Sequence, residues 1–166
     1  VVGEVPALVL FELLGLVDVD LPQLKAWSID SLELFWGTPD VARQLELSAS
    51  AADFYGWLRT LTRASRNLRG SAFFSDLVAL GLRDEEVCAI GYFLLIAGQE
   101  TTCQLISTIV MRALADPQRW RDVAASPRLA RAAVDDALRE DSSVPTWRRT
   151  TLVPAQIGGV EVPAGA

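Results

Sequence analysis

The stretch that decides the fold runs from Leu94 to Thr102 and reads Leu-Leu-Ile-Ala-Gly-Gln-Glu-Thr-Thr. It places a glycine, an acid and two threonines inside an otherwise apolar helical run. Polar groups are costly there unless they are paired, and Gly98 costs about 1 kcal/mol relative to alanine in a helix interior. Two interpretations are open from this stretch alone. One is a glycine kink packed against a neighbouring helix, with Glu100 at a solvent gap. The other is a functional turn.

The functional interpretation depends on which side chains share a face of this helix. Positions 93, 97, 100, 101 and 104 follow one face at helical spacing. That face carries an aromatic ring (Phe93), a small residue (Ala97), a carboxylate (Glu100) and a hydroxyl (Thr101). Small residues allow another body to approach the backbone closely. Thr101 can also bond back to the carbonyl of Ala97 and distort the helix. A carboxylate beside a hydroxyl over a cavity can deliver protons.

Composition predicts one folded unit and excludes some partners. The chain has 166 residues, of which 51% are hydrophobic, and its mean hydropathy is +0.27. That is enough apolar material for a substantial core in one domain, which we assign to residues 1–166. The net charge of −6 argues against a nucleic-acid partner, because phosphate binding needs clustered basic residues. The chain has no initiator methionine, and it ends within a strand-and-turn pattern at Ala166. We therefore expect a fragment of a longer protein.

The pattern along the chain is mainly α. Capping residues near a proline mark helix starts at Asp20-Leu21-Pro22, Thr38-Pro39, Asp116-Pro117 and Ser126-Pro127. We expect helices near residues 5–15, 21–36, 48–68, 73–80, 84–115, 117–124 and 127–140, with a possible short helix at 39–47 and a loop from Asn67 to Gly70. Beyond Pro145, Trp147 to Val153 predicts a strand. Ile157 to Val162 predicts a tight turn that opens a second short strand.

The segment 84–115 predicts one long central helix. Its acidic first turn suits the positive end of the helix dipole. It is apolar around most of its circumference, so we expect it to be buried. The most apolar N-terminal stretch, Val5 to Val17, is interrupted by Glu12 and is too short to span a bilayer. No membrane association is expected.

The two cysteines belong to that long helix. Cys88 and Cys103 are 15 residues apart, or roughly 22 Å along a helix, so they cannot form a disulfide. We expect both to be buried, reduced thiols of a cytoplasmic protein. The chain has no histidine and no C-x-x-C motif, so no metal site is expected within it.

Two further constellations follow the long helix. Asp136 and Arg139 are three residues apart on one helix face and can pair. Alone, they also fit an ordinary surface ion pair. Arg148 and Arg149 lie on the predicted strand, where an arginine beside a cavity can hold an anionic group. Alone, they also fit a charged edge strand.

Together, the three constellations resemble the soluble bacterial members of the cytochrome P450 family. That family's long central helix carries an A/G-G-x-D/E-T-T/S motif, matched here by Ala97 to Thr102. Its Glu-x-x-Arg helix follows about 35 residues later, matched in position by Asp136 and Arg139. The segment from Arg148 to Gly165 is similar to the strand and turn after that helix. Glu12 to Gly15 and Phe35 to Gly37 are similar to segments that precede the central helix. The resemblance covers essentially the whole chain.

The resemblance implies a P450-like helical fold, present as a partial domain with a long central helix and a small C-terminal β element. It also implies roles around a haem. Glu100 and Thr101 would be catalytic, Thr101 steadying bound dioxygen and Glu100 relaying protons. Ala97 and Gly98 would leave room for dioxygen, and Arg149 would hold a haem propionate. The substrate would be lined by Phe93, Ile96, Ala97, Val144, Pro145 and Thr146.

Two departures from the family pattern bear on these roles. Asp136 stands where the family has glutamate, one methylene longer, so the structural ion pair to Arg139 is expected to be weaker or rearranged. The family's axial ligand is a cysteine on a downstream loop that contains phenylalanine and glycine. Neither Cys88 nor Cys103 has that context, so the ligand is expected outside this chain, as are the N-terminal sheet and an early helix.

The leading hypothesis is therefore a fragment of a haem-thiolate monooxygenase that oxidises a small apolar organic substrate with electrons from a ferredoxin or flavoprotein. As it stands, the fragment alone is expected to be inactive. The alternative is a non-catalytic, P450-like helper that has lost haem and serves as an interaction partner. The Asp136 substitution favours the helper slightly, and the intact Glu100–Thr101 pair argues against it.

Overall fold

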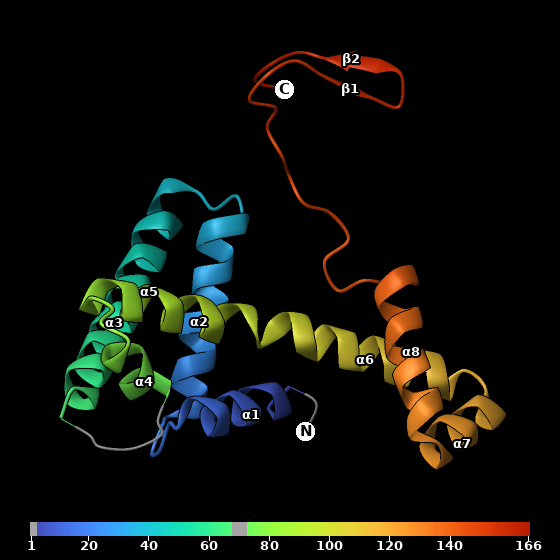
Figure 1. Ribbon diagram of the computed structural model, residues 1–166, viewed down its shortest axis with the longest axis horizontal. Helices are drawn as coiled ribbons and strands as arrows, with labels where there is room; N and C mark the ends of the chain where they lie inside the picture. Colours follow the sequence, from blue (N-terminus) through green and yellow to red (C-terminus); the bar gives the residue numbers. More distant parts are fainter. Residues whose placement is uncertain (1–2, 68–72) are drawn as a thin grey trace.

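The computed structural model describes residues 3–67 and 73–166, and most of these residues are helical. Figure 1 shows a helical body, a helix that leaves it, a second group of helices, and a hairpin. The elements are α1 (Val5–Leu14), α2 (Leu21–Trp36), α3 (Val41–Ser65), α4 (Phe73–Ala79), α5 (Asp84–Ala97), α6 (Glu100–Leu114), α7 (Pro117–Ala125), α8 (Pro127–Glu140), β1 (Ala155–Ile157) and β2 (Val160–Val162).

Helix starts follow the capping chemistry predicted from the sequence. The side chains of Asp20, Asp116 and Ser126 each accept a hydrogen bond from a backbone N–H in the first turn of α2, α7 and α8. The start expected at Thr38-Pro39 is displaced to Asp40, whose carboxylate accepts the Arg43 N–H at 2.9 Å. The short helix expected at 39–47 and the helix expected at 48–68 are therefore one helix, α3.

The core lies where α5 crosses α2, α3 and α4. Its fully buried apolar side chains come from every one of these helices, and they include Leu24, Phe54, Leu58, Phe74, Val87 and Leu95. Gly91 lets α4 approach α5 closely. A Cβ at that position would lie 2.7 Å from the Phe74 ring, which is itself buried.

The single long helix predicted at 84–115 is interrupted. α5 ends at Ala97 and α6 begins at Glu100, so Gly98 and Gln99 form a break. The predicted burial is also wrong, because only 22% of the most apolar 18-residue window in Asp84–Leu114 is buried. Beyond the body, α6 packs mainly against α7 and α8, and Met111 stays 66% exposed. The segment Asp84–Leu114 is long and apolar enough to cross a membrane. This is weak evidence for a membrane span, because helices that pass through a protein core meet the same criterion.

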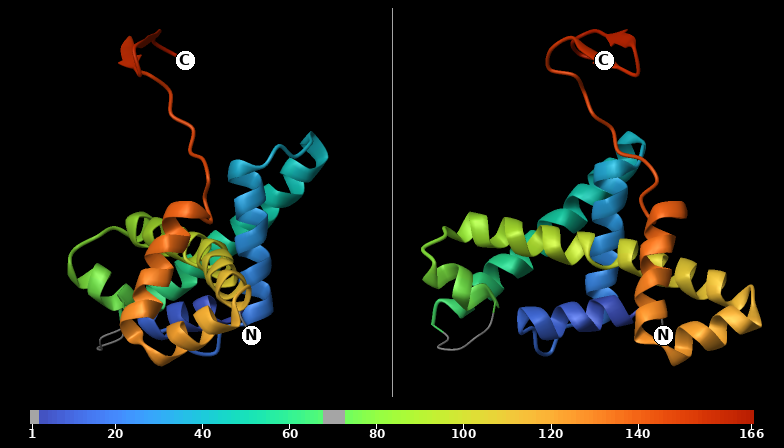
Figure 2. Two further views of the ribbon diagram at one scale, coloured as in Figure 1. Left: turned by 90° about the vertical axis from the view of Figure 1, so that its right-hand side faces the viewer. Right: turned by 45° about the vertical axis from the view of Figure 1, so that its right-hand side comes forward.

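The C-terminal segment forms a hairpin beyond an extended arm. The strand predicted at Trp147–Val153 is wrong; β1 instead pairs antiparallel with β2, with Ile157 opposite Val160. The turn between them was predicted correctly, and Gly158 and Gly159 both have positive φ. Residues 147–153 have no neighbouring strand along their length in the described chain, and only Thr151 reaches the backbone of Gly165 and Ala166. The two views in Figure 2 show the hairpin standing away from the helices.

Candidate functional site: the helix break and the surfaces beside it

The break between α5 and α6 leaves backbone groups of Gly98 and Gln99 without helical partners. The Gly98 N–H bonds to the Leu94 carbonyl at 3.0 Å, and the Cys103 N–H bonds to the Gln99 carbonyl at 2.9 Å. In the described chain, the Gln99 N–H donates to no backbone carbonyl and the Gly98 carbonyl accepts from no backbone N–H. These two groups are available to water or to a bound molecule.

The Thr101 side chain bonds to a carbonyl at the break. Its Oγ1 donates to the Ala97 carbonyl at 2.7 Å, as predicted. A side-chain bond to the carbonyl four residues earlier can bend a helix, and here it accompanies the break. Glu100, the first residue of α6, is half-buried beside it. The structure thus brings Ala97, Glu100 and Thr101 together on one turn.

Gly98 faces α1. A Cβ at position 98 would lie 3.0 Å from Leu10 Cδ1 and 3.0 Å from the Leu94 carbonyl oxygen. The missing side chain therefore permits close packing of α1, as the glycine-kink interpretation expects. A role for Gly98 beside dioxygen stays a prediction.

Gln99 is the residue that sequence reasoning passed over. It is 2% exposed, and its Nε2 donates to Ser28 Oγ at 2.8 Å and to the Leu95 carbonyl at 2.6 Å. These bonds fix the break to α2. Its Oε1 has no hydrogen-bond partner in the described chain. One sequence feature could have identified Gln99: it is an amide side chain in an apolar run. Such a side chain has to find hydrogen-bond partners when it is buried.

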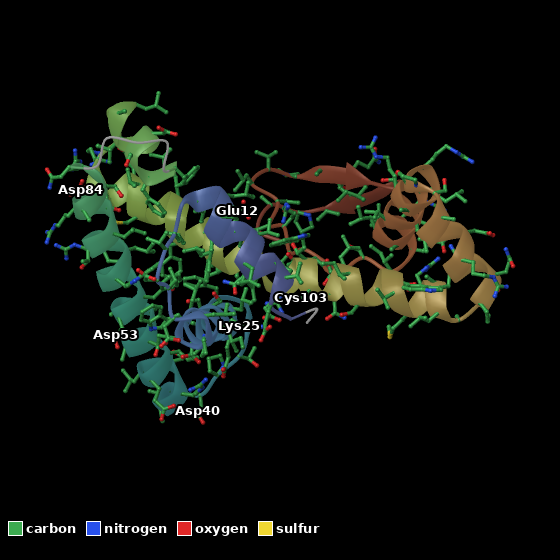
Figure 3. The ribbon with its side chains drawn as sticks, turned by 90° about the horizontal axis from the view of Figure 1, so that it is seen from below. Glu12, Lys25, Asp40, Asp53, Asp84 and Cys103 are labelled. Atoms are coloured by element: carbon green, nitrogen blue, oxygen red, sulfur yellow. The ribbon has the colours of Figure 1, made fainter. Side chains whose placement is uncertain are left out.

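The Cys103 thiol lies one turn beyond the break. Burial raises the pKa of this thiol, the Glu100 carboxylate raises it further, and Lys25 acts in the opposite direction. Figure 3 shows Cys103 close to Lys25, where α6 passes α1 and α2. Cys88 is fully buried, and its Sγ lies 3.4 Å from Thr62 Oγ1. Both cysteines are therefore buried, as predicted.

An apolar cavity of about 710 Å³, wide open to solvent, lies beside α5, one turn before the break. Phe93 and Ile96, both predicted to line the substrate, belong to its wall. Pro145, predicted for the same role, lines a different hollow of about 530 Å³ with Gln104 and Glu140. Val144 and Thr146 line neither. In neither hollow do residues 144–146 share a wall with Phe93.

Arg149 lies on the extended arm, exposed to solvent. Its Nη1 donates to the Arg148 carbonyl at 2.8 Å, and its guanidinium lies 5.8 Å from the Trp147 ring centroid. It pairs with no carboxylate in residues 3–67 and 73–166. Trp147 makes an edge contact with Trp36 at the end of α2, with ring centroids 6.3 Å apart. This contact ties the arm to the cavity wall.

Asp136 and Arg139 pair as predicted, but not in a buried site. The Arg139 Nη2 to Asp136 Oδ1 distance is 3.7 Å, and their side chains are 71% and 46% exposed. Asp136 also lies 3.7 Å from Arg119 Nη2. Exposed pairs of this kind contribute at most about 1 kcal/mol. In this structure the pair is rearranged at the surface of α8.

No family profile matches the chain, but individual relatives do. The vitamin D(3) 25-hydroxylase of Pseudonocardia autotrophica is 32% identical over 169 residues, covering 98% of this chain and 40% of that protein. Cytochrome P450 105C1 of a Streptomyces species is 34% identical over 166 residues, covering 97% of this chain and 42% of that protein. The solved structure of cytochrome P450 CREJ in complex with (4-ethylphenyl) dihydrogen phosphate has a TM-score of 0.90 at 28% identity, covering 99% of this chain and 42% of that one.

Sequence and fold thus agree on one class of protein, the haem-using cytochrome P450s, and the curated relatives are bacterial. The chain belongs to the cytochrome P450 family, as its motifs predicted. It spans about two fifths of the length of the curated relatives it matches.

Proposed function

We propose that this chain forms the oxygen-side wall of the active site of a haem-thiolate monooxygenase. The enzyme would insert one atom of dioxygen into a small apolar organic substrate, with the other atom leaving as water. The observation that carries the proposal is the open turn at Ala97–Thr102. There an acid and an alcohol lie beside the Gly98 carbonyl and the Gln99 N–H, which have no backbone partner in the described chain.

The open turn and Arg149 are the residues of this chain that would contact a haem. The open turn offers hydrogen-bonding groups next to the small side chain of Ala97, and the Arg149 guanidinium has no carboxylate partner in the described chain. Arg149 would hold a propionate, and the bound haem would supply the redox-active iron. Cys88 and Cys103 are both buried among helices, so we expect the axial cysteine outside these 166 residues.

Within this site the chain's own groups would move protons and exclude water. The Thr101 hydroxyl, now a donor to the Ala97 carbonyl, can turn to donate to a ligand at the open turn. Glu100, half-buried at the same turn, would replenish that proton from solvent. Phe93 and Ile96 would keep bulk water from the substrate. Electrons would come from a ferredoxin or flavoprotein, and we place the protein in the cytoplasm.

Replacing Thr101 tests the proton-delivery role. In the protein expressed at the full length of its gene, we expect Thr101→Val to lower product formation by about a hundredfold, because positioned proton transfer contributes that much or more. Reducing equivalents should then be diverted to hydrogen peroxide. Thr101→Ser should restore coupling. Thr102→Val is the matched control, one residue away and off this face. Equal losses in both valine variants would contradict the role.

A carbon-monoxide difference spectrum of the haem-supplemented, full-length protein separates enzyme from helper. A shifted Soret band is expected if the protein is a haem-thiolate enzyme. A folded protein with no shift would sink the monooxygenase proposal and favour the non-catalytic helper, whose support here is the exposed Asp136–Arg139 pair.

A further inference from the structure

The cavity beside α5 has an unusually aromatic wall. Five of its nine lining residues are aromatic, whereas aromatic residues make up 8% of the chain. These five come from three helices: Phe35 and Trp36 of α2, Tyr55 of α3, and Tyr92 and Phe93 of α5. Three of the other four are alanines, which leave the space between the rings open.

Tyr92 is held in place from behind. Its ring lies 4.6 Å from the ring of Phe54, which is fully buried and stacks on Trp27 at 5.3 Å. Phe35 contacts Trp36 edge-on, with centroids 5.8 Å apart. Phe35, Trp36 and Phe93 are each more than half exposed, so their faces are open to a ligand.

The cavity offers nothing to a charged ligand. No Asp, Glu, Lys or Arg is among its nine lining residues. The Tyr92 hydroxyl is already engaged with Ser31 Oγ at 2.6 Å, and burial raises the pKa of Tyr92, so this phenol stays neutral. An ion against this wall would find no opposite charge to pair with.

The aromatic wall continues toward both candidate haem contacts. Phe93 lies one helical turn before Ala97, so it leads to the open turn. Trp36 contacts Trp147, whose ring lies under the Arg149 guanidinium. A molecule in the cavity would thus lie between the open turn and the arm.

We propose that the substrate is a neutral, planar aromatic molecule, selected by stacking on Trp36 and Phe93. This inference names the substrate class of the proposed monooxygenase site and rests on that function. Offset and edge-on contacts between aromatic rings add binding free energy beyond that of the buried apolar area. A saturated ring of the same size cannot make these contacts.

The test compares 2-naphthol with decahydro-2-naphthol, which has the same skeleton and hydroxyl, by titration calorimetry on the full-length protein. We expect 2-naphthol to bind roughly tenfold more tightly. The charged 2-naphthoate should bind far more weakly than 2-naphthol. Trp36→Leu and Phe93→Leu should reduce the preference for 2-naphthol to near unity. Trp120→Leu, on α7 and outside the cavity, should leave it unchanged.

Equal affinity for the two naphthols, no binding of either, or a preference that Trp36→Leu and Phe93→Leu leave intact would overturn the inference. The carbon-monoxide spectrum keeps the two proposals apart. A Soret shift without aromatic preference would leave the monooxygenase standing and remove the substrate class. An aromatic preference without a Soret shift would remove the monooxygenase and, with it, the role of the aromatic molecule as a substrate.

Discussion

At the residue scale, two glycines with opposite surroundings show how the chain uses small side chains. Gly91 is buried where α4 approaches α5, and an added Cβ would meet the Phe74 ring at 2.7 and 2.8 Å. Gly56 lies on the exposed side of α3, with nothing within 4 Å of an added Cβ. The same substitution should therefore have opposite effects at the two positions.

We expect Gly91→Ala to lower the free energy of unfolding by about 1–3 kcal/mol, since overpacking forces a buried ring to shift. Gly56→Ala should raise it by about 0.5–1 kcal/mol, because alanine loses less backbone entropy in a helix. Urea denaturation monitored by circular dichroism measures both. A neutral Gly91→Ala would mean that Phe74 can move away without cost.

Residue-level prediction from sequence succeeded where chemistry is local. The Thr101 bond to Ala97 follows from a spacing of four residues, and the Gly158–Gly159 turn from glycine's access to positive φ. The Gln99–Ser28 hydrogen bond and the Trp36–Trp147 contact join residues 71 and 111 positions apart. No local pattern specifies such distant contacts, so they were not predicted.

At the element scale, Arg43 clamps the end of α2 to the start of α3. Its Nη2 lies 2.8 Å from Glu33 and 3.1 Å from Asp30, both on α2, and its Nη1 reaches Glu46 on α3. The clamp holds the turn next to Phe35 and Trp36. The hydrogen bond from Arg43 lowers the pKa of Glu33 from its ordinary value of 4.5.

Because the pKa of Glu33 is lowered in the folded state, the clamp stabilises the fold above pH 4.5 and loses that contribution as the pH falls through the lowered value. Arg43→Met should therefore lower the unfolding midpoint at pH 7 and have a smaller effect at pH 3. Arg59→Met, which removes an arginine without an ion pair in the described chain, is the control. A pH-independent difference between wild type and Arg43→Met would contradict this account.

Element boundaries were predictable where a cap exists and not where tertiary context decides. Asp20, Asp116 and Ser126 mark their helices in the sequence. Trp147–Val153 has the composition of a strand, but a strand needs a neighbour. The burial predicted for the long helix failed for a similar reason, because periodicity does not show how many helices cover each face.

At the scale of the whole molecule, α5 and α6 pack against different neighbours. α5 lies in the body formed with α2, α3 and α4, while α6 carries α7 and α8. The sequence motifs, read together, predicted the family and the mainly helical fold. They did not predict that the open turn lies where the chain passes from one packing environment to the other.

The open turn has a consequence for the dynamics of the backbone. Amide protons exchange with solvent when they are not held in hydrogen bonds. The Gln99 amide, which has no backbone acceptor in the described chain, should exchange deuterium rapidly, although protected helices flank it on both sides. Mass-spectrometric exchange on overlapping peptides would show fast exchange at this position between slowly exchanging α5 and α6 amides. Uniform protection from residue 84 to 114 would instead mean that the helix closes in solution.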